Sequence, residues 1–177
     1  MSNRRGWTRL RTVGTCALVL VVAACAQRAE DTIVVGLSAD ITTFEPGMIS
    51  SRDNANIARH IFAGLFSLCA DGEHTTALAY TLEITPDGTG YIYTLREGLT
   101  CHDGEALTAE DVAYTFNRIA DPANRFTGNS PGFVFTSIGF QNAEALDELR
   151  VQINIARRNP IAFGLMTEIY VHCKDSY

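Results

Sequence analysis

The sequence is short of positive charge and lacks several common catalytic and metal-binding motifs. It has 14 lysine and arginine residues against 20 acidic ones, a formal net charge of −6. Because neutralising nucleic-acid phosphates requires clustered lysine and arginine, this balance argues against a nucleic-acid partner. No SxxK, phosphate-loop or HExxH motif occurs, and no CxxC or Cys/His spacing indicates zinc or redox chemistry. We therefore expect a protein that is not an enzyme and needs no cofactor or metal.

The N-terminus has the pattern of an export signal. Four arginines precede an apolar stretch of about a dozen residues, 13–24, whereas a membrane-spanning helix needs about 20. The letters VAAC at residues 22–25 resemble a lipobox, in which small residues before a cysteine admit signal peptidase. We therefore expect a signal peptide over residues 1–24, lipidation at Cys25 and a polar tether over residues 25–31. The alternative is an ordinary export signal in which Cys25 is incidental.

Three further cysteines follow the expected anchor. An extracytoplasmic compartment permits disulfides. Cys69 and Cys101 each fall at the end of a predicted strand, so one interpretation is a Cys69–Cys101 bridge. The interpretation we prefer is that Cys69, Cys101 and Cys173 are small, buried, apolar side chains.

Apolar runs, many of them alternating or β-branched, predict a chain rich in strands. Strands are expected at residues 32–38, 65–69, 78–84, 91–95, 143–147, 150–155 and 168–173. The first of these is continuously apolar and is therefore expected to be buried. Pro86-Asp87-Gly88 predicts a hairpin, because proline presets one turn angle and glycine accepts a positive φ. Residues 39–52 and 123–137 are rich in turn-forming residues and are expected to be loops.

Helices are expected at residues 54–62, 109–120 and 160–166. Asp53 can cap the first of them. Thr108 and Asp111 form a capping box at the start of the second, whose apolar residues recur on one face. Helices interleaved with strands in this way indicate an α/β protein.

Five ordered motifs resemble those of one protein family. They are FEP at residues 44–46, IFAGL at 61–65, PDG with YIYTLREG at 86–98, HDGE with LTAEDV at 102–112, and ALD with NP at 145–160. Together they resemble the family 5 bacterial extracellular solute-binding proteins, the substrate-binding components of ABC importers for peptides, opines and nickel. Residues 76–81 depart from the family pattern, since they lack its proline and tryptophan, and Cys101 replaces an aromatic residue.

The resemblance implies an α/β fold with a mixed sheet, the first lobe of a two-lobed periplasmic-binding-protein type II fold. Residues 32–177 would be the N-terminal, incomplete part of that lobe. The implied protein is monomeric and anchored by lipid on the extracytoplasmic side, in the periplasm or at the outer cell surface. It captures oligopeptides or dipeptides for ABC permease subunits. The alternatives are binding of nickel complexes, opines or other small solutes, a truncated remnant without function, and an exported hydrolase.

The resemblance also implies which loops line the ligand cleft. They correspond here to Ser50, Ser51, Arg52, Asp53, Phe126, Thr127 and Gly128. Peptide capture needs charges opposite to those of the peptide termini, so Arg52 can meet a carboxylate and Asp53 an amine. Alternatively, Asp53 caps a helix and Arg52 is a solvated side chain. Phe126 either stacks on the ligand or fills the loop.

The histidines form no catalytic constellation. His102 and Asp103 are adjacent, but they stand at a tight turn where an aspartate usually bonds its own backbone. The resemblance marks this turn as scaffold. His60, His74 and His172 are isolated in the sequence and are expected to be surface or packing residues.

Overall fold

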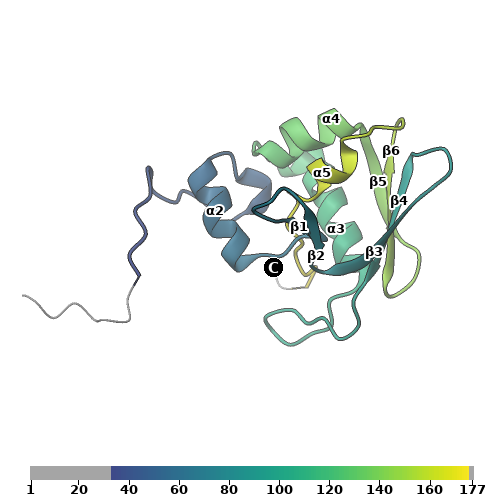
Figure 1. Ribbon diagram of the computed structural model, residues 1–177, viewed down its shortest axis with the longest axis horizontal. Helices are drawn as coiled ribbons and strands as arrows, with labels where there is room; N and C mark the ends of the chain where they lie inside the picture. Colours follow the sequence, from purple (N-terminus) through teal and green to yellow (C-terminus); the bar gives the residue numbers. More distant parts are fainter. Residues whose placement is uncertain (1–32, 176–177) are drawn as a thin grey trace, which may run out of the picture. The chain divides into compact units, whose positions relative to one another are not determined.

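The computed structural model describes residues 33–175 (Figure 1). The expected signal peptide, Cys25 and the tether lie outside the described residues. The chain divides after Leu37, and the residues that follow form one compact unit. Within residues 33–175, no helix has the length and apolar character needed to cross a membrane.

The compact unit is built on a four-stranded sheet in the order β3-β4-β6-β5, in which every pairing is antiparallel. Its strands are β3 (Ala79–Ile84), β4 (Gly90–Leu95), β5 (Phe140–Ala145) and β6 (Arg150–Ile155). The register places Tyr93 opposite both Leu82 and Val151. The expected combination of helices with a sheet is confirmed, but the part of the sheet that the structure describes is antiparallel rather than mixed.

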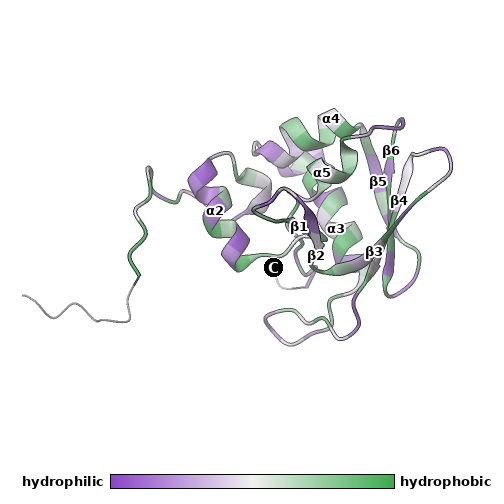
Figure 2. Ribbon diagram, viewed as in Figure 1, coloured by the Kyte–Doolittle hydropathy of each residue, from purple (hydrophilic) through white to green (hydrophobic). Residues whose placement is uncertain are grey.

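One face of this sheet forms the core. In Figure 2 the strands alternate between hydrophobic and hydrophilic residues, as expected for strands with one covered face. The inward side chains of the two central strands are buried: Tyr91, Tyr93, Leu95, Val151, Ile153 and Ile155. Removal of these side chains from water is the main stabilising contribution to the fold.

Helix α3 (Ala109–Ala120) covers that face and packs on β5 and β6. Its start follows the predicted capping box, since the Thr108 backbone N–H donates to the Asp111 carboxylate at 2.8 Å. The residues of the predicted apolar stripe are all buried: Val112, Phe116 and Ile119. The sequence pattern therefore predicted both the start of this helix and the face that it buries.

The remaining elements are short and surround this core. They are η1 (Pro46–Met48), α2 (Arg52–Ile61), the hairpin β1 (Phe66–Leu68) and β2 (His74–Thr76), η2 (Pro122–Asn124), η3 (Ser130–Phe135), α4 (Thr136–Ile138) and α5 (Ala162–Met166). The η1 and η2 segments are 3₁₀ turns, and η3 is a π-helix. Residues 123–137 are thus largely helical, and the prediction of one long loop there was wrong.

The predicted buried strand at residues 32–38 is not observed over its described part. Ile33, Val34 and Val35 are 90%, 85% and 73% exposed and belong to no strand. A β-branched run forms a strand only where a neighbouring strand accepts its backbone hydrogen bonds. No described strand pairs with this segment, which accounts for its extended, exposed state.

The predicted strand at residues 168–173 was also wrong, although much of the segment is buried. Its backbone bonds go to other partners. The Val171 N–H donates to the Ala63 carbonyl at 2.9 Å, and the His172 N–H donates to the Thr115 hydroxyl at 2.9 Å. Burial and apolar character predicted an internal segment, but its partners are a loop and a helix rather than a strand.

The cysteine predictions were wrong in both forms. Cys101 is joined to Cys173 by a disulfide with a Cα–Cα distance of 6.2 Å, within the usual range. Cys69 is free and exposed. Cys69 lies in the connection between β1 and β2, whereas Cys101 lies in the turn that precedes α3. The partner of Cys101 is therefore set by the path of the C-terminal segment.

Candidate functional site

The two loops predicted to line the ligand cleft lie against each other. The Gly128 N–H donates to the Gly47 carbonyl at 2.9 Å, and the Asn129 N–H donates to the Ile49 carbonyl at 2.8 Å. These bonds tie the segment before α2 to the segment after α3. Residues far apart in the sequence, and predicted separately, are thus brought into one place.

This contact is too close for side chains at two positions. A Cβ on Gly128 would lie 2.6 Å from the Gly47 carbonyl oxygen and 2.7 Å from that of Ile49. A Cβ on Gly47 would lie 2.7 Å from the Phe126 ring. Because the backbone around Gly128 cannot withdraw without moving a whole segment, glycine is required there, whereas at Gly47 the Phe126 ring would have to move.

Arg118 on α3 supports the paired loops from beneath. Its guanidinium donates to both carboxylate oxygens of Glu45, each at 3.0 Å, and lies 4.7 Å from the centroid of the Phe126 ring. Bidentate pairing and a cation over an aromatic face both favour a fixed position for this side chain. Phe126 is half-buried in this arrangement, which agrees with the interpretation that it fills the loop.

The electrostatics of this cluster favour the charged form of Glu45. Burial alone would raise the pKa of the Glu45 carboxyl, but hydrogen bonds from Arg118 and the Gly47 N–H, with the Arg118 charge, bring it below its usual value. Burial, reinforced by the Arg118 charge, lowers the pKa of His172, although Glu45 opposes this shift. His172 is therefore held neutral near pH 7.

The first predicted loop differs in detail from expectation. Ser51, not Asp53, caps α2: its hydroxyl accepts the Asn54 N–H at 3.1 Å, so the helix begins earlier than predicted. Asp53 instead accepts the Ala39 N–H at 2.9 Å. Ser50 and Arg52 are exposed beside it.

A pocket of about 230 Å³ opens beside these loops. Ile49 and Asn129 belong to its wall, and η3 contributes Phe133, which is 61% exposed. Glu168 is its charged residue and is paired with Arg59 at 3.2 Å. Phe133 and Glu168 were not identified from the sequence, since neither stands in a motif, and only the fold brings them to this place.

The letters GNSPG at residues 128–132 match the GxSxG pattern of many hydrolases. In those enzymes the serine stands on a turn between a strand and a helix, with its hydroxyl exposed. Ser130 instead begins η3 and is 7% exposed, and the residues that lead into it form no strand. The pattern therefore does not form a nucleophile elbow here.

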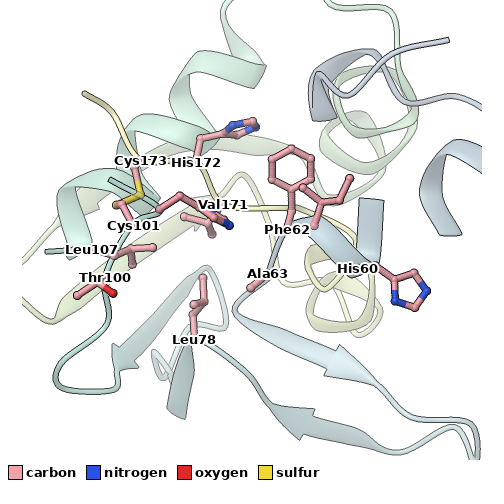
Figure 3. A pocket seen from close by; sticks show the side chains of 12 residues that line it. His60, Phe62, Ala63, Leu78, Thr100, Cys101, Leu107, Val171, His172 and Cys173 are labelled. Carbon is pink, nitrogen blue, oxygen red and sulfur yellow. A yellow bond between two sulfur atoms is a disulfide. The ribbon is translucent and has the colours of Figure 1, made fainter. Parts of the chain in front are cut away.

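A larger pocket of about 370 Å³ lies next to the disulfide. Apolar side chains form much of its wall: Phe62, Leu78, Leu107 and Val171. Figure 3 shows that the His60 ring points away from the disulfide, and so the histidines of this wall do not converge. Within residues 33–175, no group of three or more histidine, cysteine, aspartate or glutamate side chains is placed to hold a metal ion.

The HDG turn has the structural role that the sequence indicated. The Asp103 carboxylate accepts the Glu105 N–H at 3.1 Å, the local bond expected of an aspartate in a turn. His102 beside it is exposed. Asp103 therefore shapes the turn that leads to α3.

Comparisons with known proteins give relatives that are named for binding glutathione or oligopeptides. The glutathione-binding protein GsiB of Shigella boydii is 28% identical over 152 residues, which are 86% of this chain and 28% of the relative. The oligopeptide-binding protein OppA of Bacillus subtilis is 28% identical over 97 residues, 55% of this chain and 18% of the relative. The chain therefore spans less than a third of the length of these relatives.

Solved structures with a similar fold include substrate-binding proteins as well. The ABC transporter substrate-binding protein CtaP of Listeria monocytogenes is 29% identical, with a TM-score of 0.64 over 77% of this chain and 27% of that one. Peptide-bound OppA of the same organism has a TM-score of 0.71 over 82% of this chain and 31% of that one. Its 20% identity shows the likeness of the fold alone.

The family assignment rests on a match over most of the sequence. The model described as "Bacterial extracellular solute-binding proteins, family 5 Middle" matches residues 73–176, more than half of the chain. The matched region contains the four-stranded sheet, α3 and the second of the two paired loops. The chain therefore belongs to the family 5 bacterial extracellular solute-binding proteins, and its structure corresponds to part of their periplasmic-binding-protein type II fold.

Proposed function

We propose that this chain serves an ABC importer as the component that captures oligopeptides or dipeptides outside the cytoplasm. Two relatives named for binding glutathione and oligopeptides support a peptide ligand. The structural observation that carries the proposal is the pair of backbone bonds from Gly128 to Gly47 and from Asn129 to Ile49. They hold together the two loops predicted to contact the ligand.

In this proposal, the ligand meets exposed groups around the start of α2. Arg52 receives a peptide carboxylate, and Ser50 and Thr127 offer hydroxyl groups to its backbone. Asp53 uses its Oδ2 atom for the Ser38 hydroxyl and the Ala39 N–H, so Oδ1 is the oxygen directed to a ligand amine. Ser51 and Gly128 shape the loops, and Phe126 packs beneath them.

The remaining parts of the proposal concern the whole protein. Cys25 carries the lipid that anchors the protein to the membrane, and the protein acts as a monomer. Ligand binding stabilises a closed arrangement of two lobes, which then docks on the permease subunits. Binding energy drives the closure, and no covalent step takes place on the ligand.

The test is ligand binding by the full natural protein. Native mass spectrometry identifies what co-purifies, and calorimetry with dipeptides, tripeptides and glutathione measures affinity. We expect Arg52→Gln to weaken peptide binding by about tenfold, since a charge-assisted bond contributes about 1.5 kcal/mol or more. The matched Arg157→Gln, at an exposed arginine outside these loops, should bind normally. A co-purified nickel complex or opine, with no peptide affinity, would overturn the peptide assignment.

A further inference from the structure

A separate cavity of about 350 Å³ lies between the β3–β4 hairpin and the segment from β6 to α5. Figure 1 shows these two segments at the same end of the sheet. Apolar side chains form one part of the wall: Ile84, Pro86, Pro160 and Phe163. None of the residues of the paired ligand loops contributes to this cavity, so it is distinct from the site proposed above.

Arg158 is the charged residue of this cavity. Its aliphatic stem packs on Gly88, where a Cβ would meet the Arg158 Cγ at 2.7 Å and Cδ at 2.9 Å. The absence of a side chain at Gly88, in the predicted hairpin turn, therefore makes room for this arginine. The turn has a positive φ of 75° at Gly88, which glycine adopts without strain.

The Arg158 guanidinium makes no hydrogen bond or ion pair with any residue in the range 33–175. Four of the described arginines do: Arg59 with Glu168, Arg96 with Thr76, Arg118 with Glu45 and Arg150 with Asp147. Among the arginines without such a bond, Arg158 is the one that lines this cavity. Asp87, the carboxylate of the adjoining turn, accepts the hydroxyls of Thr85 and Thr89, each at 2.6 Å. Arg158 therefore lines the cavity without an ion pair to Asp87, whose oxygens are engaged within the turn.

The other polar groups of the wall bond to one another and fix its shape. The Tyr91 hydroxyl donates to the Asn159 carbonyl at 3.1 Å. The Asn159 amide donates to the Ser137 carbonyl at 2.9 Å, and its Oδ1 accepts the Ile161 N–H at 3.1 Å. A wall that is about half apolar, with its polar groups fixed by hydrogen bonds and one cationic group, has the character of a small-ligand site.

We propose that this cavity binds a small organic carboxylate with a flat apolar body. The carboxylate accepts two N–H bonds from Arg158, a geometry that the planar guanidinium favours. The body lies against Pro86, Pro160 and Phe163 and removes their apolar surface from water. This site adds a second binding function to the one proposed above and does not depend on it.

Phenylacetate is the probe, because it carries one carboxylate on one flat ring. The full protein is titrated and followed by ¹⁵N–¹H NMR, with 2-phenylethanol as the neutral analogue and acetate as the anion without a body. We expect saturable shifts at residues 84–91 and 158–163, with a dissociation constant in the millimolar range, as is usual for an exposed ion pair with a small apolar contact. Both analogues should bind at least about fivefold more weakly.

Variants assign the effect to one side chain. Arg158→Met keeps the apolar stem on Gly88 and removes the charge, so we expect it to weaken phenylacetate binding at least about fivefold. Arg158→Lys keeps the charge and should retain part of the affinity. Arg157→Met removes the adjacent exposed charge and should have no effect. Peptide binding should be unchanged in all three variants.

Three results would overturn this assignment. They are the absence of saturable shifts, equal binding of 2-phenylethanol and phenylacetate, and equal losses for the two methionine variants. The last would show attraction to net positive charge at this end of the molecule rather than a site. Each of these outcomes leaves the peptide measurements unaffected, so the two proposals fail or succeed separately.

Discussion

The Thr115 hydroxyl, in the middle of α3, accepts the His172 N–H at 2.9 Å. Its single hydrogen lies between two carbonyls, that of Asp111 at 2.8 Å and that of His172 at 3.1 Å. Thr115 is fully buried and His172 is 5% exposed. Thr115 thus provides the segment around His172 with backbone hydrogen bonding that a paired strand would otherwise provide. It explains how an apolar segment without strand pairing stays inside the fold.

Replacing the Thr115 hydroxyl with a methyl group should clearly destabilise the protein, although the change in size is small. Thr115→Val keeps the shape but leaves the buried His172 N–H without its acceptor, which costs about 1–3 kcal/mol of unfolding free energy. Thr115→Ser keeps the hydroxyl, loses a methyl group and should cost less. Urea denaturation of the three proteins measures the difference. If the valine variant is as stable as the unmodified protein, the Thr115 hydroxyl does not hold this segment.

The disulfide between Cys101 and Cys173 ties the same segment to the turn before α3. It closes a loop of 72 residues, and a loop of this length restricts the unfolded chain substantially. We expect the double substitution Cys101→Ser with Cys173→Ser to reduce the unfolding free energy by about 2–4 kcal/mol. Denaturation midpoints measured with and without a reductant provide the same comparison in the unmodified protein.

Cys69→Ser is the control for the disulfide, because Cys69 is exposed and unpaired. Its stability should match that of the unmodified protein, and reductant should still lower its midpoint. An unchanged midpoint on reduction of the unmodified protein would contradict a stabilising role for the bridge.

These two relationships show why the sequence predicted some parts and not others. The PDG hairpin and α3 depend on residues close in sequence, where turn angles and caps act locally, and both were predicted. The partner of Cys101, the bonds of His172 and the π-helix at Ser130 depend on contacts between distant segments. No local pattern contains that information, so the predicted strand ends suggested the wrong cysteine pair.

The candidate ligand loops are an intermediate case. The family resemblance singled out residues 50–53 and 126–128, and the backbone bonds of Gly128 and Asn129 reach Gly47 and Ile49, just before the first set. The resemblance did not indicate that Ser51 rather than Asp53 caps α2, because both side chains can cap and only the local dihedral angles decide. Phe133 and Glu168 join the adjacent pocket from elements without any motif.

The contact between the two loops should be sensitive to one methyl group. Gly128→Ala places a Cβ within 2.7 Å of two backbone carbonyl oxygens, so the loops must separate or the strain must remain. We expect a loss of about 1–3 kcal/mol in unfolding free energy, typical of overpacking at a site that cannot relax. Proposed peptide affinity should fall with it, since both loops contribute to that site.

Gly132→Ala is the matched control, because a Cβ there meets no atom within 4 Å. Its stability should be unchanged or slightly greater, since alanine restricts the unfolded chain more than glycine does. Equal stability of the two alanine variants would contradict the close approach described between Gly128 and Gly47.

The pairing of Glu45 with Arg118 should make the unfolding free energy depend on pH in the acidic range. The pKa of the Glu45 carboxyl lies below its usual value of 4.5 in the folded protein, chiefly because bonds from Arg118 and Gly47 outweigh the effect of burial. A depressed carboxyl pKa stabilises the folded state above the unfolded pKa, and this contribution is lost as pH falls through the folded pKa. The loss is therefore expected below about pH 4.5.

Glu45→Gln removes this titration while keeping the shape of the side chain. We expect the variant to be less stable than the unmodified protein at pH 7 by about 1–3 kcal/mol, the usual effect of losing a hydrogen bond to a charged group. The difference should shrink as the pH falls from 4.5 towards 3, because Glu45 is then protonated first in the unfolded state and at lower pH in the folded state. Urea denaturation from pH 7 to pH 3 measures both curves. Parallel curves would show that the Glu45 carboxylate adds no stability, and that Arg118 is held by Phe126 and its other surroundings alone.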